Sequence, residues 1–314
     1  MARVIITGGA GFLGSHTAEA LLAEGHEVAG IDNMRTGRED NIASLAGRPN
    51  WRFFRRDILD VDNFHKVMLA VAPEVVIHLA ALVSVPESIA NPELNFELNV
   101  RAVRVVIDCA SRCGVRRVIF ASSAAVYDEF AGVPLDEDSP TRPLSPYGEA
   151  KLEGEAMVLE GGRAMGFEAV CLRYFNIYGP RQRGDSPYSG VLSRFLDRLR
   201  TGQPLVIFGD GRQTRDFIHV RDAARANALA VTAPASSIGV FNICSGREFA
   251  INDLAAALRQ QFVSPPVSRF ELARPGDIRR SAGNPARAKV KLGFSASIEI
   301  NDGLNEFKGI SDEA

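Results

Sequence analysis

Short runs of apolar and β-branched residues alternate with longer amphipathic stretches along the first 175 residues of the chain. The short runs predict buried strands over Arg3–Thr7, Glu27–Asp32, Arg52–Arg56, Val75–Leu79, Arg117–Ser122 and Ala169–Phe175. The stretches between them predict helices over Gly11–Glu24, Val61–Val71, Leu94–Cys113 and Pro146–Met165. Strands that alternate with helices indicate βαβ units. Their right-handed crossovers predict an α/β fold with a doubly wound parallel sheet of the Rossmann type.

The alternation of strands and helices ends after Asn176, where Pro and Gly become frequent and the predicted segments shorten. We expect a helix over His219–Val231 and a strand over Val240–Cys244 to return to the sheet, and Leu205–Phe208 to stand alone as a strand. No flexible linker is visible, so the parts should be in tight contact. The expected division is a dinucleotide-binding domain of residues 1–175 and 219–243, and a smaller α/β lobe of residues 176–218 and 244–314.

Composition and charge exclude several functional classes for this protein. The 314 residues are 46% hydrophobic and 24% charged, as in a soluble globular protein, and the net charge of −2 predicts no nucleic-acid partner. The four cysteines form no CxxC pair and the five histidines show no ligand spacing, so no metal site is expected. No apolar run is long enough for a membrane span, and "MARVIIT" reads as a strand and not as a signal peptide. The expected compartment is the cytoplasm.

A glycine-rich loop, "TGGAGFLGSH", follows the first predicted strand and opens the first helix. Gly8, Gly11 and Gly14 are spaced three apart, and Gly9, Gly11 and Gly14 fit the dinucleotide fingerprint. Glycines there let backbone N–H groups approach a pyrophosphate at the helix N-terminus. Asp32 ends the second predicted strand, where a carboxylate accepts hydrogen bonds from ribose hydroxyls and repels a 2′-phosphate. The loop therefore predicts NAD rather than NADP.

The segment "SPYGEAK" contains a candidate acid/base pair. Ser145 suits an N-cap and Pro146 the first helical position, so Tyr147 lies in the first turn and Lys151 one turn further on the same face. To act as a base near neutral pH, a phenol must lower its pKa by roughly 3 units, or about 4 kcal/mol. An ammonium about 4 Å away supplies about that much at an effective dielectric of about 20. The alternative is a chance pair on a helix surface.

Taken in order, the motifs resemble those of the extended short-chain dehydrogenase/reductase superfamily, and within it the UDP-hexose 4-epimerases. The motifs are "TGGAGFLG", "HLAA" at His78–Ala81, "SSAAVY" at Ser122–Tyr127, "YGEAK", "YFNIYGPRQ" at Tyr174–Gln182, "GDGRQTRDFIHV" at Gly209–Val220 and "RPGD" at Arg274–Asp277. The resemblance implies a homodimeric isomerase that holds NAD and inverts C4 of a UDP-hexose through a transient 4-keto sugar. The implied substrates are UDP-glucose and UDP-galactose, with UDP-N-acetylglucosamine and UDP-N-acetylgalactosamine in addition.

The resemblance also implies roles for individual residues. It assigns catalysis to Ser123, Tyr147 and Lys151, with Ser123 contacting the sugar 4-hydroxyl. It implies cofactor contacts for Gly8, Gly11, Phe12, Leu13, Gly14, Asp32, Asn33, Asp57, Ile58, Leu79, Ala80, Ala81, Asn99, Ser122, Tyr147, Lys151 and Tyr174. It implies substrate contacts for Ser84, Val85, Ser123, Tyr147, Asn176, Val191, Val206, Phe208, Arg215, Arg274, Asp277 and Ser281.

Several functions on the same fold compete with this one. A sugar 4,6-dehydratase would need an Asp-Glu pair where Ala124 and Ala125 stand. A UDP-glucuronate 4-epimerase, or another oxidoreductase of nucleotide sugars, stays open as an alternative. The non-enzymatic alternative is an NAD-sensing regulator, which would be expected to lack the Tyr/Lys pair. By alignment with the family, Ser281 borders the sugar C2 substituent, and its small side chain leaves room for an acetamido group.

Overall fold

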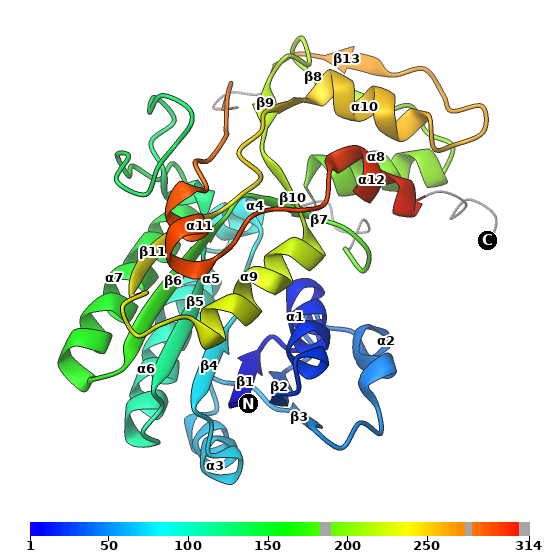
Figure 1. Ribbon diagram of the computed structural model, residues 1–314. Coiled ribbons are helices and arrows are strands. Elements are labelled where there is room, and N and C mark those ends of the chain that lie inside the picture. Colours follow the sequence, from blue (N-terminus) through cyan, green and yellow to red (C-terminus); the bar gives the residue numbers. More distant parts are fainter. Residues whose placement is uncertain (183–189, 274–277, 308–314) are drawn as a thin grey trace.

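A computed structural model describes residues 1–182, 190–273 and 278–307 of the chain (Figure 1). Seven strands form one parallel sheet in the order β11-β6-β5-β4-β1-β2-β3. They are β1 (Arg3–Thr7), β2 (Glu27–Asp32), β3 (Trp51–Arg55), β4 (Val75–His78), β5 (Arg117–Ser123), β6 (Glu168–Tyr174) and β11 (Gly239–Ile243). The strand order reverses between β1 and β4, which confirms the predicted doubly wound α/β fold.

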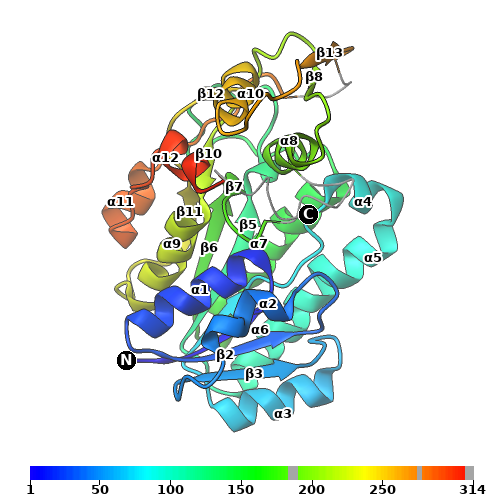
Figure 2. The same cartoon turned by 90° about the vertical axis from the view of Figure 1, so that its right-hand side faces the viewer.

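Helices cover both faces of the sheet (Figures 1 and 2). One face packs against α1 (Phe12–Ala23), α9 (Val220–Thr232) and α11 (Ala286–Leu292), and the other against α3 (Val61–Val71), α6 (Ala102–Arg112) and α7 (Pro146–Met165). Within β1, Val4 and Ile6 belong to the first core cluster and Ile5 to the second. Side chains alternate between the two buried faces, which explains why the strands read as continuous apolar runs.

The predicted helix over Leu94–Cys113 is not a single α-helix. It consists of α5 (Pro92–Phe96), a π-helical segment η2 (Glu97–Arg101) and then α6. π-turns inside helices frequently occur at functional sites, and this one carries Asn99. The other short elements beside the sheet are α2 (Glu39–Ile42), η1 (Ala43–Leu45), α4 (Val85–Ala90) and η3 (Ala124–Val126).

A smaller lobe lies above the carboxyl ends of the sheet strands in Figure 1. Its described residues form three strand pairs: β7 (Asn176–Tyr178) with β10 (Phe217–His219), β9 (Thr214–Arg215) with β12 (Phe249–Ala250), and β8 (Val206–Phe208) with β13 (Arg269–Glu271). Its helices are α8 (Val191–Arg200), α10 (Ile251–Arg259), α12 (Ile300–Leu304) and η4 (Asn305–Phe307). The expectation that β8 stands alone is wrong, because β13 pairs with it from a distant part of the chain.

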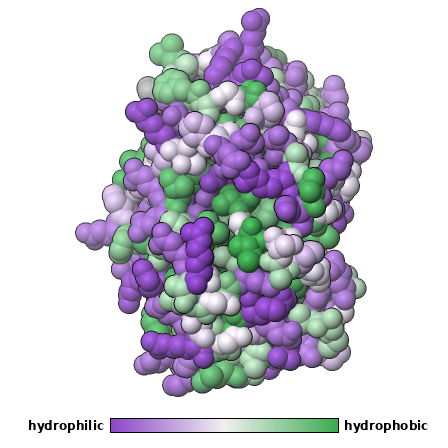
Figure 3. All heavy atoms as spheres, turned by 60° about the vertical axis from the view of Figure 1, so that its left-hand side comes forward, coloured by the Kyte–Doolittle hydropathy of each residue, from purple (hydrophilic) through white to green (hydrophobic). Residues whose placement is uncertain are grey.

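The two parts of the chain interleave along the sequence. The side chains of Ala288, Leu292 and Phe294 join the core of the main sheet, although the sequence placed this stretch in the smaller lobe. Apart from this segment, we propose the division into residues 1–175 with 219–243, and 176–218 with 244–314. In the described part of the chain, no helix is both long and apolar enough to cross a membrane. The face in Figure 3 carries mainly hydrophilic side chains, with hydrophobic ones near its centre.

Candidate active site

The glycine-rich loop forms a tight turn between β1 and α1. Gly8 has a positive φ of 73°, which glycine adopts without strain. A Cβ atom on Gly14 would lie 2.0 Å from the Gly8 carbonyl oxygen, so only glycine fits there. The N-cap of α1 is Gly11, which supplies no side-chain hydrogen bond to the first turn. The bare N-terminus of α1 is therefore suited to an anion such as a pyrophosphate.

Asp32 fixes the other side of this loop. Its carboxylate accepts hydrogen bonds from the backbone N–H groups of Ala10, at 3.0 Å, and Met34, at 2.8 Å. Burial raises the pKa of Asp32, and these two hydrogen bonds oppose the rise. A Cβ atom on Gly8 would lie 2.9 Å from the nitrogen of Ala80, so the "HLAA" segment lies directly against the loop. These residues form a glycine-lined cradle with a carboxylate at the end of β2, and they fit a dinucleotide.

A buried hydrogen bond shapes the "HLAA" segment. Thr7 Oγ1 and His78 Nδ1 lie 2.7 Å apart, and Thr7 Oγ1 also accepts a hydrogen bond from the Ala80 N–H at 3.2 Å. Burial, with a smaller effect of the Lys151 charge, lowers the pKa of His78 to about 3, so the ring is neutral. The segment Leu79–Ala81 is thereby held at the carboxyl end of β4. The sequence analysis missed the role of Thr7, although it belongs to the "TGG" motif.

Three of the residues expected at the cofactor lie together at the ends of β2 and β3. Asn33 follows β2 and donates a hydrogen bond from Nδ2 to Asp57 Oδ2 at 2.9 Å. Asp57 also accepts the Leu59 N–H at 2.8 Å, and Ile58 is buried beside it. The ends of β2 and β3 are thus joined next to the glycine loop.

Asn99 organises the segment that follows "HLAA". Its Oδ1 accepts the Leu82 N–H, and its Nδ2 donates to the Leu82 carbonyl, both at 2.9 Å. The same amide nitrogen donates to Asn95 Oδ1 at 2.7 Å, and Asn95 in turn donates to the Pro146 carbonyl at 2.9 Å. Both N–H groups of Asn99 are therefore used within the protein. The amide links the predicted cofactor loop to the start of α7 rather than offering a free donor.

The N-terminus of α7 is docked tightly beside β5. Ser145 Oγ accepts the Gly148 N–H at 3.2 Å, which confirms the predicted N-cap. Ser88 Oγ, from α4, accepts the Tyr147 N–H at 3.2 Å. A Cβ atom on Gly148 would lie 2.5 Å from the Ala125 carbonyl oxygen, so glycine permits the close approach to η3. Tyr147 is consequently buried in the first turn.

Tyr147, Ser123 and Lys151 meet at the carboxyl end of β5. Lys151 Nζ donates to the Ala121 carbonyl at 2.8 Å and lies 5.8 Å from the centre of the Tyr147 ring. Burial lowers the pKa of Lys151 to about 8, against the opposing effect of Glu155. Burial raises the pKa of Tyr147, although its hydrogen bond with Ser123 lowers it. Ionisation of the phenol by the lysine therefore stays a prediction, and burial opposes it in the protein by itself.

Two residues expected at the cofactor direct their hydroxyl groups elsewhere. Ser122 Oγ donates to a carboxylate oxygen of Glu155. The Tyr174 hydroxyl donates to Asn227 Oδ1 at 2.7 Å, and burial raises its pKa. Their cofactor contacts stay predictions, and they would involve the backbone or the ring.

The residues expected around the sugar and the diphosphate come from both parts of the chain. Ser84 is the N-cap of α4, with its Oγ accepting the Glu87 N–H at 3.0 Å, and Val85 is the first residue of that helix. Asn176 lies at the start of β7 and donates from Nδ2 to the Asp216 carbonyl at 2.8 Å.

Arg215, on β9, is half-buried and donates to the Ile278 carbonyl at 2.6 Å. The predicted Arg274 and Asp277 lie outside the described residues. Ser281 is half-buried in the segment that follows them.

Three further residues expected at the substrate lie on β8 and α8. Val206 and Phe208 are half-buried and line a cavity of about 250 Å³ with the α8 residues Arg194, Phe195 and Arg198. Val191 is the first residue of α8. Their contacts with the substrate stay predictions.

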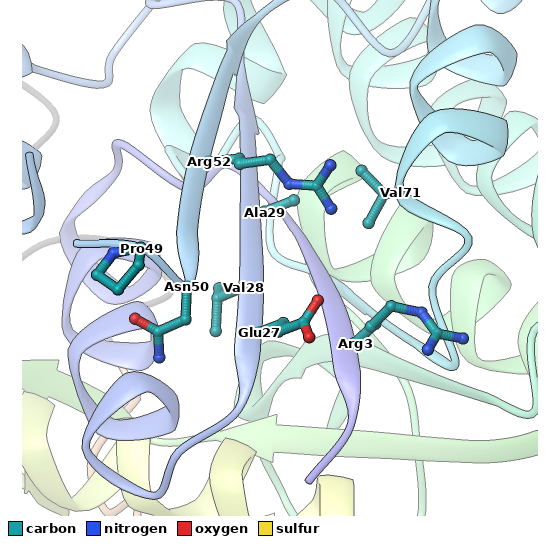
Figure 4. A pocket seen from close by; sticks show the side chains of 8 residues that line it. All are labelled: Arg3, Glu27, Val28, Ala29, Pro49, Asn50, Arg52 and Val71. Atoms are coloured by element: carbon teal, nitrogen blue, oxygen red, sulfur yellow. The ribbon is translucent and has the colours of Figure 1, made fainter. Parts of the chain in front are cut away.

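A second cavity, of about 350 Å³, lies at the opposite edge of the sheet (Figure 4). Arg3, Glu27, Asn50 and Arg52 are among the residues that line it, at the amino ends of β1, β2 and β3. Ligands of open α/β sheets bind at the carboxyl ends, so this cavity is not the candidate active site. No group of three His, Cys, Asp or Glu side chains is placed to hold a metal ion in the described ranges.

Comparisons with known proteins agree with this geometry. The model of the NAD dependent epimerase/dehydratase family matches residues 4–244. A UDP-glucose 4-epimerase of Mycolicibacterium smegmatis is 34% identical over 303 residues, which cover 96% of each protein.

Two solved structures are similar over nearly their whole length. One is a UDP-glucose 4-epimerase from Thermotoga maritima with UDP-glucose, at a TM-score of 0.89, 34% identity and 96% coverage of both chains. The other is a UDP-N-acetylglucosamine 4-epimerase from Methanobrevibacter ruminantium M1 in complex with UDP-N-acetylmuramic acid. It has a TM-score of 0.89 and 34% identity, and the match covers 98% of this chain and 96% of the other.

Proposed function

Because this chain belongs to the NAD-dependent epimerase/dehydratase family and is a UDP-sugar 4-epimerase, we propose that it acts on UDP-hexoses with either a hydroxyl or an acetamido group at C2. The proposed substrates are UDP-glucose and UDP-galactose, and UDP-N-acetylglucosamine and UDP-N-acetylgalactosamine. Its cofactor is NAD. The observation that carries the proposal is the group of Tyr147 and Lys151, both buried, with the half-buried Ser123 at the carboxyl end of β5.

These three residues perform the proton chemistry at the sugar 4-hydroxyl. NAD, when bound, supplies the acceptor and donor of the hydride at C4. Tyr147 takes the O4 proton and later returns it, and Ser123 hydrogen-bonds the phenol throughout. The Lys151 ammonium lies 5.8 Å from the centre of the Tyr147 ring and favours the phenolate electrostatically. Because burial opposes that charge, the phenolate needs the ammonium and any further positive charge the filled site provides.

Inversion requires the 4-keto sugar to present its other face, so the sugar must turn while the nucleotide stays bound. We assign the grip on the diphosphate to Arg215, Arg274 and Asn176. A guanidinium binds phosphate oxygens bidentately, which an ammonium does not. Binding energy at the remote diphosphate then serves the chemistry at C4.

We propose that Ser281 sets the size of the C2 substituent that the site accepts. A serine leaves room for an acetamido group, whereas a bulky aromatic residue would fill that space. Ser281→Tyr should therefore remove turnover of UDP-N-acetylglucosamine and spare UDP-glucose. The expected change in selectivity is roughly 5- to 150-fold, because overfilling a packed site costs about 1–3 kcal/mol. Equal loss of both activities would indicate general damage, and no loss of either would place Ser281 outside the pocket.

The deciding experiment is a turnover assay of the purified protein, without added reductant, on UDP-glucose, UDP-N-acetylglucosamine and UDP-glucuronate. We expect the first two to be converted to their C4 epimers. Conversion of UDP-glucuronate alone would replace this proposal with a UDP-glucuronate 4-epimerase. Turnover of none of the three, with NAD bound, would favour an NAD-sensing regulator.

We also propose that the protein is a cytoplasmic homodimer. The exposed apolar side chains of Ile89 and Phe96, on α4 and α5, support a contact with a second copy on that side. Light scattering coupled to gel filtration tests the dimer, and a monomeric mass at micromolar concentration would contradict it.

A further inference from the structure

A buried ion pair lies directly behind the catalytic residues. Glu155 is on α7, one helical turn after Lys151, and Arg173 is on β6. Both side chains are at least 95% buried. Arg173 donates to Glu155 Oε1 from Nε at 2.8 Å and to Oε2 from Nη2 at 2.7 Å, and Ser122 Oγ donates to Oε1. The carboxylate is therefore fully desolvated and bound by three donors.

The surroundings hold Arg173 in one place. Its Nη1 donates to the Glu137 carbonyl at 3.1 Å, and its guanidinium lies 4.8 Å from the centre of the Tyr127 ring. Burial by itself lowers the pKa of Arg173, but the hydrogen bonds with Glu155 and the charge of Glu155 raise it, and the net shift is upward. Desolvation makes such a buried pair a weak source of stability compared with apolar side chains of similar volume. Its place beside the active site therefore points to a role other than stability.

Three residues of α7 engage three consecutive residues of β5. Tyr147, Lys151 and Glu155 are spaced four apart, so they form one stripe along the helix. Tyr147 is hydrogen-bonded to Ser123, Lys151 to the carbonyl of Ala121, and Glu155 to Ser122. The ion pair thus fixes Ser122, which lies between Ala121 and Ser123 at the end of β5.

We propose that Glu155 is a positioning residue that keeps Lys151 cationic and holds the carboxyl end of β5 in place for Tyr147. This inference rests on the proposed function, since it gives Lys151 and Tyr147 their catalytic roles. Glu155 itself lies one turn below Lys151 on α7 and acts through Lys151 and Ser122.

The charged and titratable groups around Lys151 support this assignment. From α7 they are Tyr147 and Glu155, from β4 His78, and from β6 Cys171 and Arg173, which both interact with Glu155. His78 is neutral, and burial raises the pKa of the Cys171 thiol well above its usual value, so it is neutral too. Within the described chain, Glu155 is the group that raises the pKa of Lys151 against the effect of burial.

Four variants test the proposal. Glu155→Gln keeps an acceptor for Ser122 but removes the charge, and Glu155→Asp keeps the charge in a shorter side chain. The double variant Glu155→Gln/Arg173→Met removes both charges, which proteins usually tolerate better than half of a buried pair. Glu153→Gln is the matched control, because Glu153 is exposed on the same helix.

Two measurements report on Lys151. The first is the pH profile of kcat/KM, in which activity falls at high pH as Lys151 loses its proton. The second is the titration of the Lys151 ammonium itself, followed by NMR in protein labelled with ¹⁵N-lysine and assigned by difference from Lys151→Met, and it needs no substrate. Thermal unfolding identifies any variant that fails to fold. If the wild type epimerises no UDP-sugar, the proposed function fails while the lysine titration still tests the role of Glu155.

The expected results follow from the attraction between the Glu155 carboxylate and the Lys151 ammonium. Removing a carboxylate lowers the pKa of Lys151, so the high-pH decline should move to lower pH by about one unit or more in Glu155→Gln. It should move less in the double variant, where the Arg173 charge is also gone, and stay in place in Glu155→Asp and Glu153→Gln. The Lys151 ammonium itself should titrate at lower pH in Glu155→Gln, and by less in the double variant. A folded double variant with the profile and titration of the wild type would overturn the proposal, as would Glu155→Asp behaving like Glu155→Gln.

Discussion

Replacing Lys151 with methionine should slow epimerisation in a way that higher pH partly restores. The ammonium lies 5.8 Å from the centre of the Tyr147 ring. With the phenolate charge placed at the ring centre, two unit charges at that separation interact by about 3 kcal/mol at an effective dielectric of about 20. This is equivalent to about 2 pKa units of the phenol. Because removing a cation disfavours the phenolate, the pKa of Tyr147 should rise, and kcat/KM near neutral pH should fall about 100-fold.

The assay is kcat/KM over a range of pH, with the NAD content of each preparation measured in parallel. In Lys151→Met the rise of activity with pH should move up by about 2 units. Lys151→Arg keeps the charge but not the compact ammonium that reaches the Ala121 carbonyl, so its activity should fall without that displacement. Lys66→Met, at an exposed position, is the control. Loss of activity in Lys151→Met with an unchanged pH profile would refute the electrostatic argument.

Three further substitutions have defined outcomes. Tyr147→Phe should lower kcat about 10²–10⁴-fold and leave UDP affinity, measured by calorimetry, nearly unchanged; near-full activity would contradict the assignment. Gly14→Ala should lower NAD content and thermal stability together, because its Cβ atom would lie 2.0 Å from the Gly8 carbonyl oxygen, and normal NAD retention would contradict this. Arg117→Met should cost about 3–5 kcal/mol of the free energy of unfolding in urea, because Arg117 is fully buried and pairs with Glu168 at 2.6 Å; a loss below about 1 kcal/mol would contradict it.

Elements with strong local signals could be predicted from the sequence. The bounds of α7 follow from Ser145 as N-cap, Pro146 at the first position and Gly166 with a φ of 83° after the last turn. The spacing of Tyr147 and Lys151 on that helix follows from the same signals. These features depend on residues within a few positions of one another, so a single sequence contains them.

Features that depend on distant partners could not be predicted. Glu155 bonds to Ser122, 33 positions away, and no local pattern indicates that partner. The spacing of four after Lys151 was the available signal that Glu155 shares the face of α7 that carries Tyr147 and Lys151. The raised pKa of Tyr147 was also missed, because burial is a property of the folded chain.

One buried carboxylate holds together the segments around the proposed diphosphate site, which must stay fixed during the proposed reaction. Asp216, fully buried, accepts hydrogen bonds from the Ser245 N–H at 2.8 Å and hydroxyl at 2.6 Å, the Gly246 N–H at 2.9 Å and the Gly283 N–H at 3.2 Å. This one carboxylate joins three segments beside Arg215 and Ser281. A diphosphate held by Arg215 would therefore rest on a fixed frame. The acid/base group lies instead at the end of β5, so the nucleotide can stay bound while the sugar turns.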